Sequence, residues 1–160
     1  MIKLRPFRQT PGLCGPASLK MVFDYYGVLV SETKIAKAAG ATPEKGCSIK
    51  GLIKATKHFG FRAYLKKKSS LDDLRYFVKK KKVPVIVDWF SEDEGHYSVV
   101  VDINKKNITL IDPSLKRGKR KFSTEKFLRI WFDFPGKYIK DPKEIILRLM
   151  LVIVPDGFKY

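Results

Sequence analysis

The chain has 160 residues, of which 44% are apolar, and its 33 lysines and arginines against 16 aspartates and glutamates give a formal net charge of +17. This apolar content can bury a full core in one domain over residues 1–160, and no linker, repeat or low-complexity tract divides the chain. The N-terminus lacks the apolar core of a secretory signal, and the apolar run 145–154 is too short to span a bilayer. These features exclude a secreted or membrane-spanning protein of the usual kind, and we expect a cytoplasmic location.

The first predicted helix begins at Cys14. Apolar residues at helical spacing define its buried face, and Gly27 supplies a left-handed stop; the apolar residues are Leu19, Val22, Phe23 and Tyr26. At a helix N-terminus the macrodipole and the unpaired N–H groups favour a thiolate, which is the form of cysteine that attacks a carbonyl group. The alternative interpretation is that Cys14 is a small apolar residue packed under the sheet.

Gln9 is the single glutamine of the chain, and it precedes Cys14 by five residues. A neutral amide donor near an attacked carbonyl can stabilise the oxyanion that develops there. The spacing therefore predicts that Cys14 is a thiol nucleophile and that Gln9, close to it, is the oxyanion donor.

A second predicted helix lies within residues 48–60 and carries His58 near its last turn. A histidine there complements the helix C-terminus or is exposed, so we give His58 no catalytic role. We interpret Cys47, just before this helix, as a small buried residue, with a regulatory disulfide to Cys14 as the alternative. Without a signal sequence a structural disulfide is not expected, and two cysteines without paired histidines make a poor zinc set. We therefore expect neither a metal ion nor a cofactor.

The following elements are a strand near 61–65, a helix over 71–80 and a strand over 83–90. Ser70 and Asp73 form a start that resembles a capping box. The run 145–154 is interpreted as a helix that turns into a strand, or as a terminal core strand. Helices packed on one side of an antiparallel sheet predict an α+β architecture.

His96 follows an acidic loop and Gly95 and opens the apolar strand 97–101. Strand ends and the adjoining loops commonly present catalytic side chains. The turn 104–107 joins this strand to 107–113, and antiparallel pairing brings Asp112 back toward the level of His96. A carboxylate there can hydrogen-bond one imidazole nitrogen and leave the other for a cysteine. The alternative for Asp112 is a turn-forming pair with Pro113.

Together these residues resemble the papain-like cysteine peptidase domains that process bacteriocin leader peptides at double-glycine sites, and their stand-alone relatives. The resemblance rests on three motifs: Gln9 and Cys14 in Gln-x-x-x-x-Cys-Gly-Pro-Ala, Gly95-His96-Tyr97 before an apolar strand, and Asp112-Pro113 closing the next strand. It implies a papain-like α+β fold, with a helical N-terminal half packed on an antiparallel-sheet C-terminal half and a cleft between them. It further implies Cys14 as nucleophile, His96 as base, Asp112 as the residue that orients the base, and Gln9 as oxyanion donor.

The leading hypothesis is a cysteine peptidase acting on a peptide or protein, with glycine-rich cleavage sites implied by the resemblance. The alternatives are acyl transfer through the same acyl-enzyme and a non-catalytic peptide-binding module. Basic runs at 66–68, 79–82 and 116–121 could attract nucleic acid, an anionic membrane surface or an acidic peptide substrate. We favour a solvated lysine-rich surface, because no nucleic-acid motif with interleaved aromatic residues is present.

Overall fold

The structure is a computed structural model, and it describes residues 1–159. Three helices form the N-terminal part: α1 (Cys14–Tyr25), α2 (Glu32–Ala39) and α3 (Ile49–His58). The hydroxyl groups of Ser31 and Ser48 cap α2 and α3 by accepting backbone N–H groups of the first turn. Helix α2 was not singled out in the sequence, although the capping Ser31 and the left-handed Gly40 mark its two ends.

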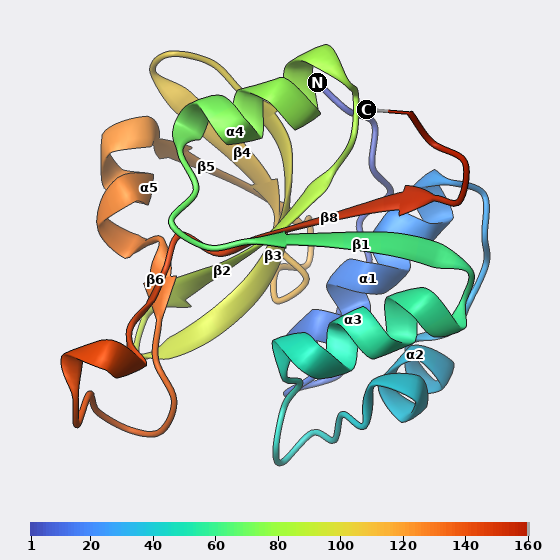
Figure 1. Cartoon of the computed structure of the whole chain (residues 1–160), viewed down its shortest axis with the longest axis horizontal. Helices are drawn as coiled ribbons and strands as arrows, with labels where there is room; N and C mark the ends of the chain where they lie inside the picture. The colour runs from blue at the N-terminus through green and yellow to red at the C-terminus, as the bar shows by residue number, and fades with distance from the viewer. Residues whose placement is uncertain (160) are drawn as a thin grey trace.

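A six-stranded antiparallel sheet forms the rest of the framework (Figure 1). In spatial order its strands are β1 (Phe61–Lys66), β8 (Met150–Pro155), β2 (Val85–Ser91), β3 (Glu94–Ile103), β4 (Asn107–Ile111) and β5 (Lys119–Ser123). The last strand of the chain, β8, therefore lies between β1 and β2. Of the two interpretations of the apolar run 145–154, this confirms the core strand, and residues 145–149 form no helix before it.

Strand β5 overlaps the basic run 116–121, which the sequence suggested was part of a solvated surface. Its residues alternate between exposed and half-buried, so Arg120 and Phe122 turn toward the protein while Lys119 and Lys121 face solvent. Because the outward-facing residues are lysines and one inward-facing residue is Arg120, the strand lacks the alternation of apolar and polar residues that indicates a strand in a sequence.

The remaining elements are short. Helix α4 (Leu71–Arg75) continues into the π-helical turn η1 (Tyr76–Lys80), which confirms the helix expected over 71–80, and the Ser70–Asp73 capping box is formed. Helix α5 (Thr124–Ile130) follows β5, and strands β6 (Phe132–Asp133) and β7 (Ile146–Leu147) pair on either side of the 3-10 turn η2 (Pro142–Glu144). No helix within residues 1–159 is long and apolar enough to cross a membrane.

Helices cover both faces of the sheet, whereas the sequence predicted them on one side. Phe23 of α1 stacks on Phe61 of β1 with ring centroids 4.5 Å apart, and Phe77 of η1 contacts Tyr64 of the same strand. Residues 61 and 64 point to opposite faces because side chains alternate along a strand. The N-terminal helices therefore lie on one face and the α4–η1 segment on the other, a difference that leaves the α+β class unchanged.

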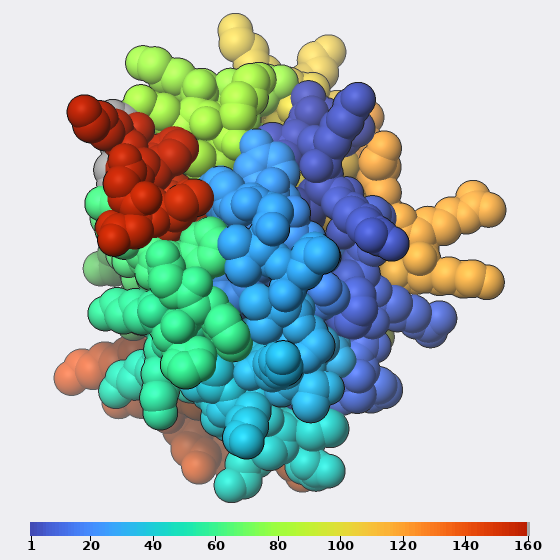
Figure 2. All heavy atoms as spheres, turned by 90° about the vertical axis from the view of Figure 1, so that its right-hand side faces the viewer, coloured from blue at the N-terminus to red at the C-terminus, as the bar shows by residue number. Residues whose placement is uncertain are grey.

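Helix α1 is the most deeply buried helix. Leu19, Met21, Val22 and Phe23 have no accessible surface, because α2, α3 and the sheet enclose them. Figure 2 shows the outer side of this layer, where the segments around residues 25–60 form a continuous face between the N-terminal segment and the C-terminal end of the chain. The first residue of α1, Cys14, is consequently held on a rigid support.

Candidate active site

Cys14 is the first residue of α1 and is half-buried at the surface of the molecule. No side chain caps this end of the helix, and its first turn contains no acidic residue. The preceding Gly12 has φ +83°, and a Cβ atom there would lie 2.1 Å from the carbonyl oxygen of Pro43. Only glycine therefore fits the loop that leads into the helix, and the unpaired N–H groups of the first turn favour negative charge beside Cys14.

His96 on β3 and Asp112 at the end of β4 meet as the hairpin predicted. The Nε2 atom of His96 lies 2.6 Å from Oδ1 of Asp112, and both side chains are buried. Burial alone would lower the pKa of His96, but the hydrogen bond to Asp112 and the hydrogen bond and charge of Cys14 outweigh it and raise the pKa from 6.5 to about 9. The structure thus brings the imidazole between the buried carboxylate and the thiol, with Nδ1 not engaged by Asp112.

Asp112 also receives hydrogen bonds that the sequence did not predict. The backbone N–H and hydroxyl groups of Ser114 donate to Oδ1 at 2.9 and 2.7 Å, and Nε of Arg120 donates to Oδ2 at 2.8 Å. Burial alone would raise the pKa of Asp112, but the hydrogen bond and charge of His96 and the hydrogen bonds from Ser114 hold it well below its usual range. The carboxylate is therefore charged and fixed in position.

Trp89 on β2 packs beside this pair. Its ring meets that of His96 edge to face with centroids 5.6 Å apart, and the Arg120 guanidinium lies 5.7 Å from the indole centroid. The indole N–H donates to Ser98 Oγ at 3.0 Å, which fixes the ring in the core. Trp89 therefore packs against both His96 and the arginine that pairs with Asp112, contacts that the strand pattern alone did not indicate.

Gln9 lies in the same cleft as Cys14 and His96, whose volume is ≈ 510 Å³. Its backbone N–H donates to the carbonyl oxygen of Pro113 at 2.9 Å, which ties the segment before α1 to the end of β4. Its side-chain Nε2 contacts the carbonyl oxygen of Thr10 at 3.4 Å. The four residues singled out in the sequence are thus gathered at one place, with Asp112 behind His96.

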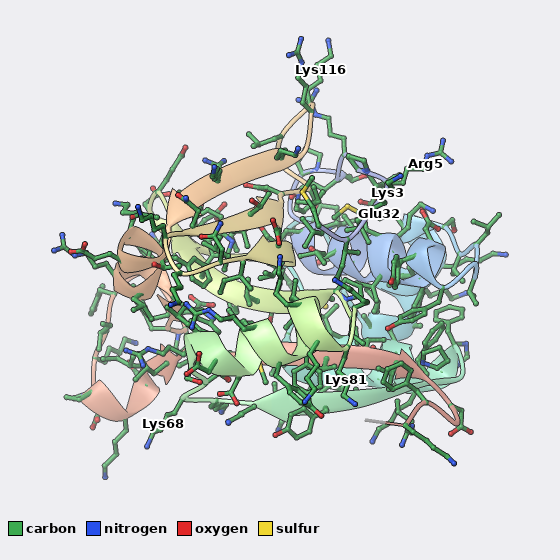
Figure 3. The ribbon with its side chains drawn as sticks, turned by 90° about the horizontal axis from the view of Figure 1, so that it is seen from above. Lys3, Arg5, Glu32, Lys68, Lys81 and Lys116 are labelled. Atoms are coloured by element: carbon green, nitrogen blue, oxygen red, sulfur yellow. The ribbon has the colours of Figure 1, made fainter. Side chains whose placement is uncertain are left out.

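Glu32 of α2 holds the segment that carries Gln9. Its two carboxylate oxygens accept the Thr10 N–H at 3.0 Å and the Thr10 hydroxyl at 2.6 Å. Glu32 is nearly buried and lies beside the N-terminal segment that carries Lys3 and Arg5 (Figure 3). The capping position at the start of α2 was the signal that could have pointed to this helix, but the contact with Thr10 follows only from packing.

Cys47 is half-buried and lines the cleft next to the cap of α3. Burial, assisted by the charge of Cys14, raises its pKa to about 12. Cys14 and Cys47 are both free thiols. His58, by contrast, is exposed at the end of α3, as predicted. Residues 1–159 contain no group of three or more His, Cys, Asp or Glu side chains placed to hold a metal ion.

The comparisons with known proteins agree on one family. The model of the Peptidase C39 family matches residues 9–134, a range that contains Gln9, Cys14, His96 and Asp112. An uncharacterized protein of Methanothermobacter thermautotrophicus is 39% identical over 104 residues, which are 65% of this chain and 67% of that protein. The family match therefore covers most of the chain.

Two solved structures share the fold. The peptidase domain of Streptococcus ComA, a bifunctional ABC transporter of a quorum-sensing pathway, is 23% identical with a TM-score of 0.72, over 98% of this chain and 100% of that one. A double glycine motif protease from an AMS/PCAT transporter, solved with its leader peptide, is 23% identical with a TM-score of 0.68, over 96% and 93%. The predicted papain-like α+β fold is thereby confirmed, and the chain belongs to the Peptidase C39 family of cysteine peptidases.

Proposed function

We propose that this protein hydrolyses peptide bonds with Cys14 as nucleophile, His96 as base, Asp112 as the residue that orients the base, and Gln9 as oxyanion donor. The observation that carries the proposal is the position of His96, hydrogen-bonded through Nε2 to a buried carboxylate while it interacts with Cys14. A nucleophile next to a base that a third group orients is the arrangement covalent catalysis requires.

In the first half of the reaction the imidazole of His96 takes the thiol proton, and the Cys14 sulfur attacks the peptide carbonyl. The tetrahedral oxyanion accepts hydrogen bonds from the Cys14 backbone N–H and the Gln9 amide. His96 then gives its proton to the leaving amine, the C–N bond breaks, and a thioester acyl-enzyme remains.

In the second half a water molecule replaces the amine product. His96 takes a proton from this water as the water oxygen attacks the thioester carbon. The C–S bond then breaks, the carboxylic acid product is released, and the Cys14 sulfur leaves as a thiolate paired with the protonated His96. The raised pKa of His96, about 9, favours the protonated imidazole that stabilises a thiolate at neutral pH. Asp112 remains ionised throughout, because its pKa is held well below the usual range.

A peptide substrate is supported by the neighbour that was solved with its leader peptide. Cleavage after glycine-rich sites is the specificity that the family suggests. The basic runs lie on separate parts of the molecule, since Lys116 points to the opposite side of the view from Lys68 and Lys81 (Figure 3). They do not form one continuous patch at the cleft, which favours a solvated surface over a nucleic-acid or membrane site.

The test is the rate of alkylation by iodoacetamide from about pH 5 to about pH 9, with the modified residue identified by mass spectrometry. The wild type is compared with Cys14→Ala and His96→Ala, and His58→Ala serves as the control for loss of a histidine outside the cleft. Fast labelling of Cys14 well below the ordinary thiol pKa, lost in His96→Ala and retained in His58→Ala, supports the proposal. Slow labelling that His96→Ala leaves unchanged would contradict it and favour the peptide-binding module.

The products formed from one set of peptides separate hydrolysis from acyl transfer. Peptides with a central Gly-Gly pair are incubated with the wild type and with Cys14→Ala, with and without an added amine. Release of a free carboxylate product that depends on Cys14 indicates hydrolysis, whereas a transpeptidated product indicates transfer of the same acyl group to the amine.

A further inference from the structure

Two carboxyl groups that neither the sequence nor the proposed reaction uses line the cleft beside Cys14 and His96. They belong to Asp88 on β2 and Asp133 on β6. Asp88 pairs with Tyr97 across the β2–β3 ladder, and the ring of Tyr97 lies near Gly15 of α1. The Asp88 side chain is therefore on the sheet face that α1 covers, on the same side as Cys14.

Asp88 is 3% exposed, and its Oδ1 atom has no hydrogen-bond donor in the described part of the chain. Burial, followed by the charge and hydrogen bond of Asp133, raises the pKa of Asp88 to about 9. Asp88 therefore holds a proton at neutral pH as long as no cation lies beside it. A buried acceptor without a donor is costly, so the pair lacks the cation or hydrogen-bond donor that would complete it.

Asp133 is held in place from two sides. The Phe134 N–H donates to its Oδ1 at 2.7 Å, and a Cβ atom on Gly95 would lie 2.2 Å from its Oδ2. Phe90 of β2 stacks on Phe132 and on Phe134 with centroids 5.2 and 5.3 Å apart, which anchors β6 against the sheet. The carboxylate is thus directed at the residue next to His96 by packing and is not free to turn away.

The cleft has the opposite charge balance from the rest of the molecule. The chain as a whole carries +17, yet the acidic side chains that line the cleft outnumber the basic ones; the acids are Glu44, Asp88, Glu92, Glu94 and Asp133, and the bases are Lys45, His96 and Arg120. The Arg120 guanidinium is already paired with Asp112. A positively charged group that enters the cleft therefore meets uncompensated negative charge.

We propose that Asp88 and Asp133 form a specificity subsite that binds a lysine or arginine side chain of the peptide, within two residues of the bond that is cleaved. The cation donates hydrogen bonds to the unpartnered Oδ1 of Asp88 and to Asp133, and the proton of Asp88 leaves to solvent. The statement that the basic side chain lies within two residues of the cleaved bond rests on the proposed function, whereas the binding of a basic side chain does not. The net charge of the chain suggested an acidic peptide substrate; acidic residues of a substrate would then contact the basic outer surface and not this part of the cleft.

The test measures binding without turnover. The probes are acetylated hexapeptide amides built on a central Gly-Gly pair, in which each position in turn carries lysine, norleucine or glutamate, and calorimetry gives their affinity for the Cys14→Ala protein. Lysine at one position is expected to bind about tenfold more tightly than norleucine, which has a similar shape without the charge. The same preference is expected to disappear when Asp88→Asn or Asp133→Asn is added and to persist with Asp72→Asn, which removes an exposed carboxylate outside the cleft.

Equal affinities for the three peptides, no binding at millimolar concentration, or a lysine preference that survives in both asparagine variants would each overturn the subsite. Cleavage by the wild type separates the two proposals. Binding that depends on the carboxyl pair, with no cleavage and an ordinary Cys14 thiol, leaves the subsite standing and refutes the peptidase. Cleavage without a preference for lysine refutes the subsite alone.

Discussion

The Nε2 atom of His96 and the Oδ1 atom of Asp112 lie 2.6 Å apart, although the two residues are 16 positions apart in the chain and Asp112 follows the end of a different strand. The β3–β4 register places Val99 opposite Ile111, so the end of β4 returns toward the start of β3. The contact fixes the ring of His96 from behind. A substitution of Asp112 should therefore change the reactivity of the Cys14 thiol through the imidazole of His96.

Replacement of Asp112 by asparagine tests this coupling. Asp112→Asn keeps the side-chain shape but removes the carboxylate whose hydrogen bond and charge help to raise the pKa of His96 to about 9. We expect that pKa to fall by at least about one unit, and kcat/KM to fall by about two to four orders of magnitude. An NMR titration of the His96 ring measures the first effect and peptide cleavage the second. Asp72→Asn, at an exposed site, is the control, and an unchanged titration of His96 in Asp112→Asn would refute the coupling.

Stability should depend on pH through Asp88. Its folded-state pKa of about 9 lies above the ordinary 3.8, so the stabilisation from binding its proton is complete below 3.8 and is lost as the pH rises through 9. In Asp88→Asn this loss is absent, because the amide does not titrate.

We therefore compare the stability of Asp88→Asn with that of the wild type at pH 4 and at pH 8. The difference should shift in favour of Asp88→Asn by up to about 5 kcal/mol between the two pH values. Urea unfolding of both proteins at pH 4 and pH 8 gives the free energies of unfolding. Asp72→Asn again controls for the loss of a surface carboxylate. A stability difference that is the same at both pH values would show that Asp88 is not protonated in the folded protein.

The two cysteines should differ in reactivity. Burial raises the pKa of Cys47 to about 12, so it stays a thiol across the neutral range, and the thiolate is the form that reacts. We expect iodoacetamide at neutral pH to modify the wild type once, at Cys14, and to modify Cys47→Ala at the same rate. Peptide mass mapping locates the modification, and labelling of Cys47 as fast as that of Cys14 would contradict the expectation. Intact mass under non-reducing conditions tests the disulfide between the two residues.

Glu32 should act as a positioning residue for Gln9. Thr10→Val removes the hydroxyl that donates to Glu32 at 2.6 Å, and Thr10→Ser retains it. If the oxyanion donor is displaced, kcat falls while KM changes little, because the lost interaction is made in the transition state. We expect kcat to fall about tenfold in Thr10→Val and to recover in Thr10→Ser. A change confined to stability, with kcat equal in both variants, would assign this contact a purely structural role.

Local sequence signals predicted the helix at Cys14 and the strand at His96, because apolar spacing and glycine stops depend only on neighbours in the chain. They also predicted that Asp112 approaches His96, since a short hairpin turn sets the register of its two strands. Local signals did not predict β5, because its outward-facing lysines obscure the alternation, nor Arg120 behind Asp112. Local signals likewise did not predict that helices cover both faces of the sheet. Which face each side chain of a strand points to is known only once the pairing of the strands is known.

The sequence by itself therefore determined which residue types stand at the helix N-terminus and at the ends of one hairpin. Only the tertiary structure decided that Asp88 and Asp133 meet in the cleft, because β2 and β6 approach through the packing of Phe90 on Phe132 and Phe134. It likewise decided that Glu32 anchors Thr10, and that β8 lies between β1 and β2. Contacts between distant segments depend on how whole faces bury their apolar surface, and no local pattern of residues encodes that arrangement.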